Sequence, residues 1–164
     1  MLASAAATAY PGRNYILIAI MLLWPLFDKH WQLPPFPRNA TNYLSWIMTV
    51  VVASALLLWQ PEQTVFAGTT LVTAALPEEW FFRAYLMTTL GRDWRANAVA
   101  SAVFSLLHGL TANWTTALLV FAPSLFYGWL YQRTRDLPLL ILVHGLSNLV
   151  FALFIADPLT AWLG

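Results

Sequence analysis

The chain contains no cysteine and carries little charge. Its 164 residues include no thiol, which excludes disulfide bonds, thiolate zinc sites and cysteine nucleophiles. Charged residues make up 9% of the sequence and hydrophobic residues 60%, whereas soluble domains average about 25% charged and about 45 to 50% apolar residues. The net charge of +1 gives no reason to expect nucleic acid as a partner. The composition is typical of an integral membrane protein.

Six hydrophobic runs approach the length of about 17 to 25 residues with which a helix crosses a bilayer. They cover residues 14–31, 42–60, 64–90, 94–111, 114–132 and 137–156. The third run is long, and Pro77 in its middle predicts a kink or a break. We therefore expect an all-α fold, a polytopic bundle of about six transmembrane helices that forms a single membrane domain over residues 1–164.

Lys and Arg are distributed unevenly between the two sides of such a bundle. One side has only Arg13, and the other has Lys29, Arg38, Arg92, Arg95, Arg133 and Arg135. Because the cytoplasmic loops of membrane proteins carry an excess of Lys and Arg, we expect the second side to face the cytoplasm.

A few polar side chains able to do chemistry remain inside the predicted helices. They are Glu78, Glu79, Arg83, His108, His144 and Asn148. An ionisable group near the bilayer centre costs about 2.5 to 3.5 kcal/mol on insertion scales, so it usually marks a pathway or an active site. At about 1.5 Å per residue, most of these residues fall in one depth band near mid-membrane. We interpret them as one site facing the bundle interior.

The spacing of these residues supports a shared site. Residues four apart lie on one face of a helix, and Glu78 points about 100° away from Glu79, so one glutamate can pair with Arg83 while its neighbour faces the site. Gly109 and Gly145 follow the two histidines, and small residues let membrane helices approach closely. The pairs with four-residue spacing are Glu79 with Arg83, Phe104 with His108, and His144 with Asn148.

Three motifs occur in a fixed order on successive predicted helices. They are E-E-x-x-x-R, F-x-x-x-H and H-x-x-x-N, present here as P-E-E-W-F-F-R, F-S-L-L-H and H-G-L-S-N. The ordered set resembles the CAAX prenyl protease and bacteriocin-processing (CPBP, Abi) family of glutamic intramembrane proteases, in particular its small prokaryotic type. The resemblance covers about residues 64–155.

This resemblance implies glutamate-dependent intramembrane proteolysis without a cofactor or metal. Glu78 and His108 would activate water, and His144 and Asn148 would stabilise the oxyanion. The supporting residues would be Glu79 and Arg83, with Phe104 lining the cavity. The implied substrate is a membrane-anchored protein or peptide cut near its C-terminal tail, which carries a sorting signal or a prenyl group. The implied location is the lipid bilayer of a prokaryotic cytoplasmic membrane, with no nucleic acid as a partner.

Other functions remain open from the residues alone. Two histidines and a glutamate are a known zinc ligand set, so a zinc protease is the enzymatic alternative, although H-E-x-x-H spacing is absent. A buried glutamate and histidine also suit a proton-coupled carrier or a non-catalytic peptide-binding or immunity protein.

Overall fold

The computed structural model describes residues 13–32 and 42–156. Within these two ranges the regular elements are all helical, which confirms the predicted all-α class. Each predicted hydrophobic run corresponds to one helix or one string of helical segments. The uninterrupted helices are α1 (Arg13–Phe27), α2 (Tyr43–Trp59), α6 (Trp94–Thr111), α7 (Trp114–Thr134) and α8 (Leu137–Phe154).

The third run forms one composite helix. A single turn, η3 (Pro61–Gln63), precedes it, and two wide π-helical segments interrupt its α-helical pitch. Its segments are α3 (Thr64–Thr70), the π-helix η4 (Leu71–Ala75), α4 (Leu76–Glu79), the π-helix η5 (Trp80–Met87) and α5 (Thr88–Leu90).

The sequence predicts a kink or a break at Pro77, and the structure has a distortion of the helix without a break. A proline inside an α-helix lacks an N–H and clashes with the carbonyl four residues earlier. Here the turn before Pro77 is widened, and the Leu76 N–H donates to the Leu71 carbonyl oxygen, a π-type bond that accommodates the proline. The helix is distorted at Pro77 but not broken. The sharp bend lies after Trp59 instead, where α2 and the helix that begins at Pro61 meet at 115°.

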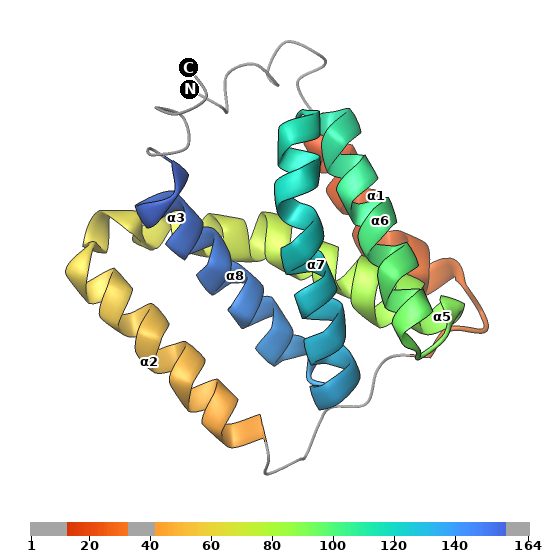
Figure 1. The fold of residues 1–164 in the computed structure, drawn as a ribbon, viewed down its shortest axis with the longest axis horizontal. Coiled ribbons are helices and arrows are strands. Elements are labelled where there is room, and N and C mark those ends of the chain that lie inside the picture. The colour runs from red at the N-terminus through yellow and green to blue at the C-terminus, as the bar shows by residue number, and fades with distance from the viewer. Residues whose placement is uncertain (1–12, 33–41, 157–164) are drawn as a thin grey trace.

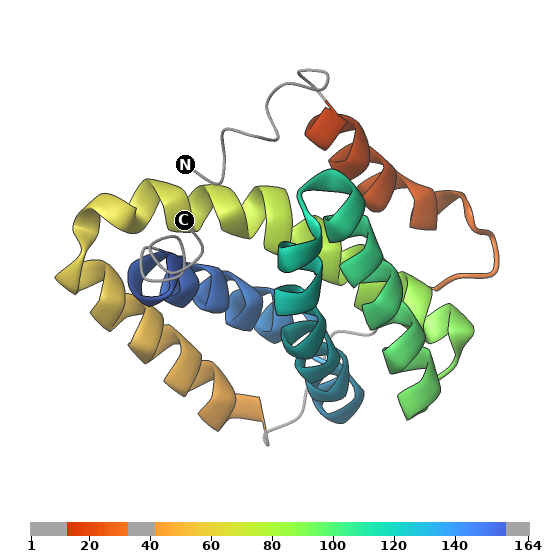
Figure 2. The same ribbon diagram turned by 45° about the horizontal axis from the view of Figure 1, so that its top comes forward.

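The composite helix crosses the molecule, and the other helices pack against it (Figure 1, Figure 2). Helix α8 contacts α3, η4, α4 and η5, while α2 packs on the outer side of α8. Helix α1 contacts α4 and η5, and the hairpin of α6 and α7 contacts η5. As a result α1, α6, α7 and α8 surround the middle of the composite helix.

Helix α8 meets the length and hydropathy criterion for a membrane span by itself, with 18 residues and a mean hydropathy of 2.1. Helix α2 and residues 61–90 meet this criterion only together, when the bent pair is counted as a single span. Many apolar side chains point outward, including Phe27, Leu58 and Leu118 at 78%, 84% and 79% exposure. This surface suits a lipid environment, and the predicted number of six spans stays a prediction.

A buried carboxylate joins α2 to the turn between α7 and α8. Asp136 is 3% exposed. Its Oδ1 accepts the Leu139 N–H at 3.0 Å and so caps α8, while its Oδ2 accepts the Trp46 indole N–H at 2.8 Å and the Asn42 amide at 3.2 Å. One side chain therefore fixes both the start of α8 and the position of α2.

Helices α6 and α7 approach each other closely at Gly128. A Cβ atom placed there would collide with the side-chain amide of Asn97. That amide donates from Nδ2 to the Leu125 carbonyl oxygen at 2.9 Å, and its Oδ1 accepts the Ser101 hydroxyl at 3.2 Å. Glycine at position 128 thus makes room for a buried polar contact between the two helices.

We predict that Asp136→Ala destabilises the protein by about 3 kcal/mol, because the Leu139 N–H and the Trp46 indole N–H lose their acceptor at about 1 to 3 kcal/mol each, while the Asn42 amide keeps the Thr134 carbonyl oxygen. The matched control is Asp93→Ala, since Asp93 is an exposed N-cap that accepts only the Ala96 N–H and its loss should cost about 1 kcal/mol. Denaturation of the purified variants in detergent measures both. Equal losses would contradict the anchoring role of Asp136.

We predict that Gly128→Ala destabilises the protein, because the added methyl group must displace Asn97 from its hydrogen bonds. Gly68→Ala is the control: a Cβ at Gly68 in α3 meets nothing within 4 Å, so this change should stabilise the helix by up to about 1 kcal/mol. Thermal unfolding should move in opposite directions for the two variants. A neutral Gly128→Ala would show that the helices can separate at no cost.

Candidate active site

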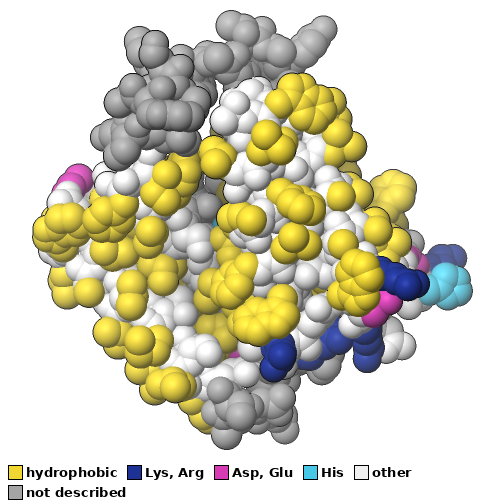
Figure 3. Space-filling view, viewed as in Figure 1, with side chains coloured by type: hydrophobic (Ala, Val, Ile, Leu, Met, Phe, Trp, Pro, Cys, Tyr) yellow, Lys and Arg dark blue, Asp and Glu magenta, His cyan; other side chains and the backbone are white. Residues whose placement is uncertain are grey.

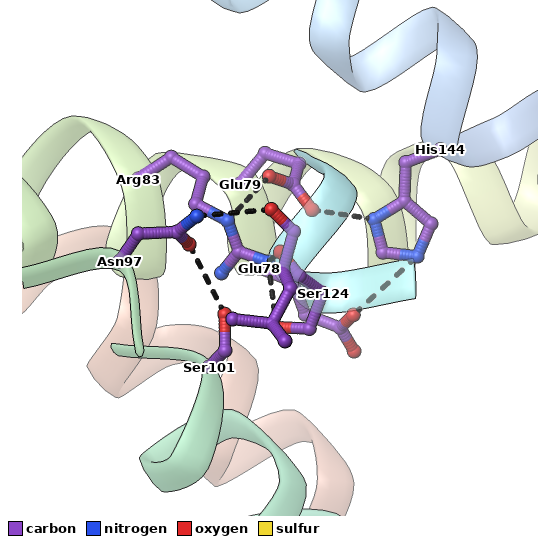
Figure 4. Close-up of polar contacts among 8 residues, drawn as sticks. Glu78, Glu79, Arg83, Asn97, Ser101, Ser124 and His144 are labelled. Carbon is purple, nitrogen blue, oxygen red and sulfur yellow. Dashed lines mark hydrogen bonds and ion pairs between the residues drawn. The ribbon is translucent and has the colours of Figure 1, made fainter. Parts of the chain in front are cut away.

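Glu79 is completely enclosed between two basic side chains. Its carboxylate is 0% exposed. The Oε1 atom lies 2.7 Å from Nδ1 of His144, and Oε2 lies 3.5 Å from Nε of Arg83 (Figure 4). The Arg83 contact is the pairing expected from their four-residue spacing, whereas the bond to His144 joins α4 to α8.

Arg83, in η5, is also 0% exposed. Its Nη2 donates to the Ser124 hydroxyl at 2.8 Å and to the Ser124 carbonyl oxygen at 3.0 Å. Its guanidinium carbon lies 5.5 Å from the centroid of the Phe104 ring, within the range of a cation–π contact. The buried cation is therefore held by a carboxylate from α4, by the hydroxyl and the carbonyl of a serine in α7, and by an aromatic ring from α6.

Glu78 has a different environment from Glu79, although the two are adjacent. Its side chain is 17% exposed, and its Oε2 lies 3.7 Å from Nε2 of His144. That separation exceeds the length of a direct hydrogen bond. His144 consequently stands between the two carboxylates, bonded to Glu79 through one ring nitrogen and facing Glu78 with the other.

His144 is held in place from two further directions. Its ring stacks on Tyr127 of α7, with centroids 4.8 Å apart and planes at 24°. The next residue is Gly145, where a Cβ would come within 2.7 Å of the Leu71 side chain in η4. The missing side chain lets α8 lie against the composite helix, which brings the imidazole within reach of both glutamates.

His108 enters from α6 beside Phe104. Its Nδ1 lies 3.0 Å from the Phe104 carbonyl oxygen, so Nδ1 carries the proton of this hydrogen bond. The rings of Phe104 and His108 are 4.4 Å apart. His108 is also near enough to Glu78 to interact with it electrostatically.

Asn148 is the least engaged of the residues expected at the site. It is partly exposed, one turn after His144 on α8, and its amide forms no hydrogen bond with the described residues. The structure thus gathers Glu78, Glu79, Arg83 and His144 into one contiguous cluster, places His108 beside it, and leaves Asn148 with free hydrogen-bonding capacity nearby.

Over residues 13–32 and 42–156, no three His, Asp or Glu side chains converge as a metal-binding group.

Two contributors from α7 were missed by the sequence reasoning. Ser124 binds Arg83 and Tyr127 stacks on His144. Both are polar side chains within the apolar run 114–132, which is the signal that could have drawn attention to them. Their role could not be deduced, because it depends on how α7 crosses the composite helix.

Comparison with known proteins identifies the family. The family model described as Type II CAAX prenyl endopeptidase Rce1-like matches residues 59–150, more than half of the chain and all of the cluster. Neither the curated proteins nor the solved structures gave a match. The matched family is a family of membrane-embedded proteases, in agreement with the predicted resemblance. The chain therefore belongs to the Type II CAAX prenyl endopeptidase Rce1-like family.

Proposed function

We propose that this protein is an intramembrane endopeptidase that uses water activated by Glu78 to cut near the C-terminal tail of a membrane-anchored protein. The tail carries a prenyl group or a sorting signal. The observation that carries the proposal is the division between two adjacent carboxylates. Glu79 is enclosed, with a hydrogen bond to His144 and an ion pair with Arg83, whereas Glu78 is partly exposed beside two histidines. Only Glu78 has an oxygen available to a water molecule.

Glu78 acts as the general base. It accepts a proton from water as the water oxygen bonds to the scissile carbonyl carbon, and the carbonyl oxygen takes up negative charge. The C–N bond then breaks as the proton passes from Glu78 to the leaving amine. His108 orients the same water, because its Nε2 accepts a hydrogen bond while the Phe104 carbonyl oxygen fixes the ring through Nδ1.

His144 and Asn148 supply the oxyanion donors. A doubly protonated His144 donates Nδ1–H to Glu79 and directs Nε2–H toward the reaction. The Asn148 amide, one turn along α8, provides the second donor. Removal of one such donor typically costs about 100- to 1000-fold in rate.

Glu79, Arg83 and Phe104 support this machinery without taking part in proton transfer. Glu79 fixes the orientation of His144 and stabilises its protonated form, as a carboxylate commonly does for a catalytic histidine. Arg83 balances the charge of Glu79, and Phe104 contacts both Arg83 and His108. Phe104 therefore packs between the Glu79–Arg83 pair and His108, the residue that orients the water.

We predict that Glu78→Gln reduces turnover of tail peptides by about 100- to 10,000-fold, the range of a general base, with thermal stability unchanged. Glu62→Gln is the control, because Glu62 is an exposed glutamate in η3, outside the cluster. Purified proteins are assayed on prenylated and unprenylated membrane-anchored peptides, with and without a chelator.

Each arm of that experiment separates one alternative. A folded Glu78→Gln protein that still cleaves would contradict the glutamate mechanism. Activity lost to chelator and restored by zinc would assign the residues to a metal instead. Substrate-linked proton flux without any cleavage would favour a carrier.

We predict that Arg83→Met destabilises the protein by about 3 to 5 kcal/mol, because it leaves a buried carboxylate without its cation. The double variant Glu79→Gln/Arg83→Met removes both charges and should recover a large part of that loss. Unfolding of the single and double variants in detergent measures the coupling. Additive losses would show that the two side chains do not depend on each other.

A further inference from the structure

A second polar site lies apart from the glutamate cluster. It is a pocket of about 460 Å³, formed by the segment after α1, the end of the composite helix and the C-terminal end of α7. None of the proposed catalytic residues lines it. The polar side chains of its lining include Asp28, Thr88, Arg92, Tyr131 and Arg135.

Two arginines and one tyrosine line this pocket together. Tyr131 has a side chain that is 1% exposed, and its hydroxyl forms no hydrogen bond with the described part of the chain. The Arg135 guanidinium carbon lies 5.8 Å from the centre of the Tyr131 ring, and Arg92 lines the same pocket. Arg135 ends α7 in the left-handed conformation, with φ 53°, which turns the chain at the pocket wall.

The one carboxylate in the lining is already engaged. Asp28 accepts the His30 backbone N–H at 2.9 Å through Oδ1 and the Tyr85 hydroxyl at 3.3 Å through Oδ2. Neither arginine forms an ion pair with a carboxylate among the described residues. Two guanidinium groups and a phenol donor therefore face a common space, an arrangement suited to an anion.

The pocket lies at the basic end of the molecule. Figure 3 shows Lys and Arg side chains gathered along one edge, with apolar side chains over much of the remaining face. Trp94 and Trp129 are 71% and 46% exposed near this end, and each lies under an arginine, Arg95 and Arg133 respectively. Exposed tryptophans of this kind mark the boundary between headgroups and hydrocarbon. The sequence predicts that this edge faces the cytoplasm.

We propose that the pocket binds the phosphate of an anionic phospholipid headgroup, held by Arg92, Arg135 and the Tyr131 hydroxyl. Basic pockets between membrane helices on the cytoplasmic side are suited to such headgroups. The volume exceeds that needed for a phosphate ion and leaves space for a polar headgroup such as glycerol. Phe27 and Leu90, next to lining residues in the sequence, are 78% and 50% exposed and offer an apolar surface to the acyl chains. A lipid therefore matches both the charge and the surroundings of the pocket, whereas a soluble phosphate matches only the charge.

Native mass spectrometry of the purified full chain tests this binding without any need for peptidase activity. The protein is titrated with phosphatidylglycerol and, separately, with phosphatidylcholine. Wild-type protein should retain phosphatidylglycerol at least about tenfold better. Arg92→Gln/Arg135→Gln should lose that preference, and Tyr131→Phe should weaken it several-fold. The matched control is Arg95→Gln/Arg133→Gln, which removes the same charge from the same edge outside the pocket and should keep the wild-type preference.

Three outcomes would overturn the proposal. Equal losses in the two double variants would assign lipid binding to the basic edge as a whole. Displacement of phosphatidylglycerol by inorganic phosphate at the same concentration would make the ligand a soluble anion. If Arg92→Gln/Arg135→Gln keeps the wild-type lipid preference but has a raised KM for tail peptides in phosphatidylcholine vesicles, the pocket binds the substrate's own carboxylate and not a lipid. Because retention of lipid is measured directly, failure here is distinct from failure of the proposed proteolysis.

Discussion

The burial of the Glu79 and Arg83 charges inside an apolar bundle is the constraint on which the rest of the structure depends. A buried ion must be paired and hydrogen-bonded, since an unpaired charge in a low-dielectric interior costs several kcal/mol. The pair alone leaves part of this requirement unmet, so the surrounding helices contribute His144, Ser124 and Phe104. The need to neutralise two charges thus fixes the positions of α6, α7 and α8 around the composite helix.

Backbone geometry makes this arrangement possible. The π-helical segments on either side of α4 change the pitch of the composite helix, and Pro77 fits into the widened turn. A wide turn also leaves carbonyl groups open to outside donors: the Ala84 carbonyl oxygen in η5 accepts the indole N–H of Trp31 at 3.0 Å. Gly145 then lets α8 come close enough for His144 to reach both glutamates. Local irregularity of this kind is frequent at functional sites.

The molecule therefore contains two polar regions of different character within one apolar body. In the interior, charges are matched and a single carboxylate, Glu78, keeps an accessible oxygen, which suits chemistry on a substrate held in the membrane. At the basic edge, cations outnumber the free carboxylates around an open pocket, which suits the binding of an anion. A membrane-embedded protease needs both an enclosed reaction site and a defined level in the bilayer, and under the two proposals the cluster would serve the first need and the pocket the second.

The sequence by itself determined the helical class, the approximate bounds of each helix, the family and the identity of the residues that gather at the site. The lengths of the hydrophobic runs predict the helices. Because a polar residue inside an apolar run is costly, the few that occur there are candidates for a functional site. Helical periodicity also placed Glu79 beside Arg83. Only the tertiary structure decided that His144 bonds to Glu79, that Ser124 and Tyr127 complete the cluster, and that Pro77 is absorbed in a π-turn. These features depend on how helices cross and how closely they approach, which arises from packing between segments far apart in the chain and leaves no periodic trace in the sequence.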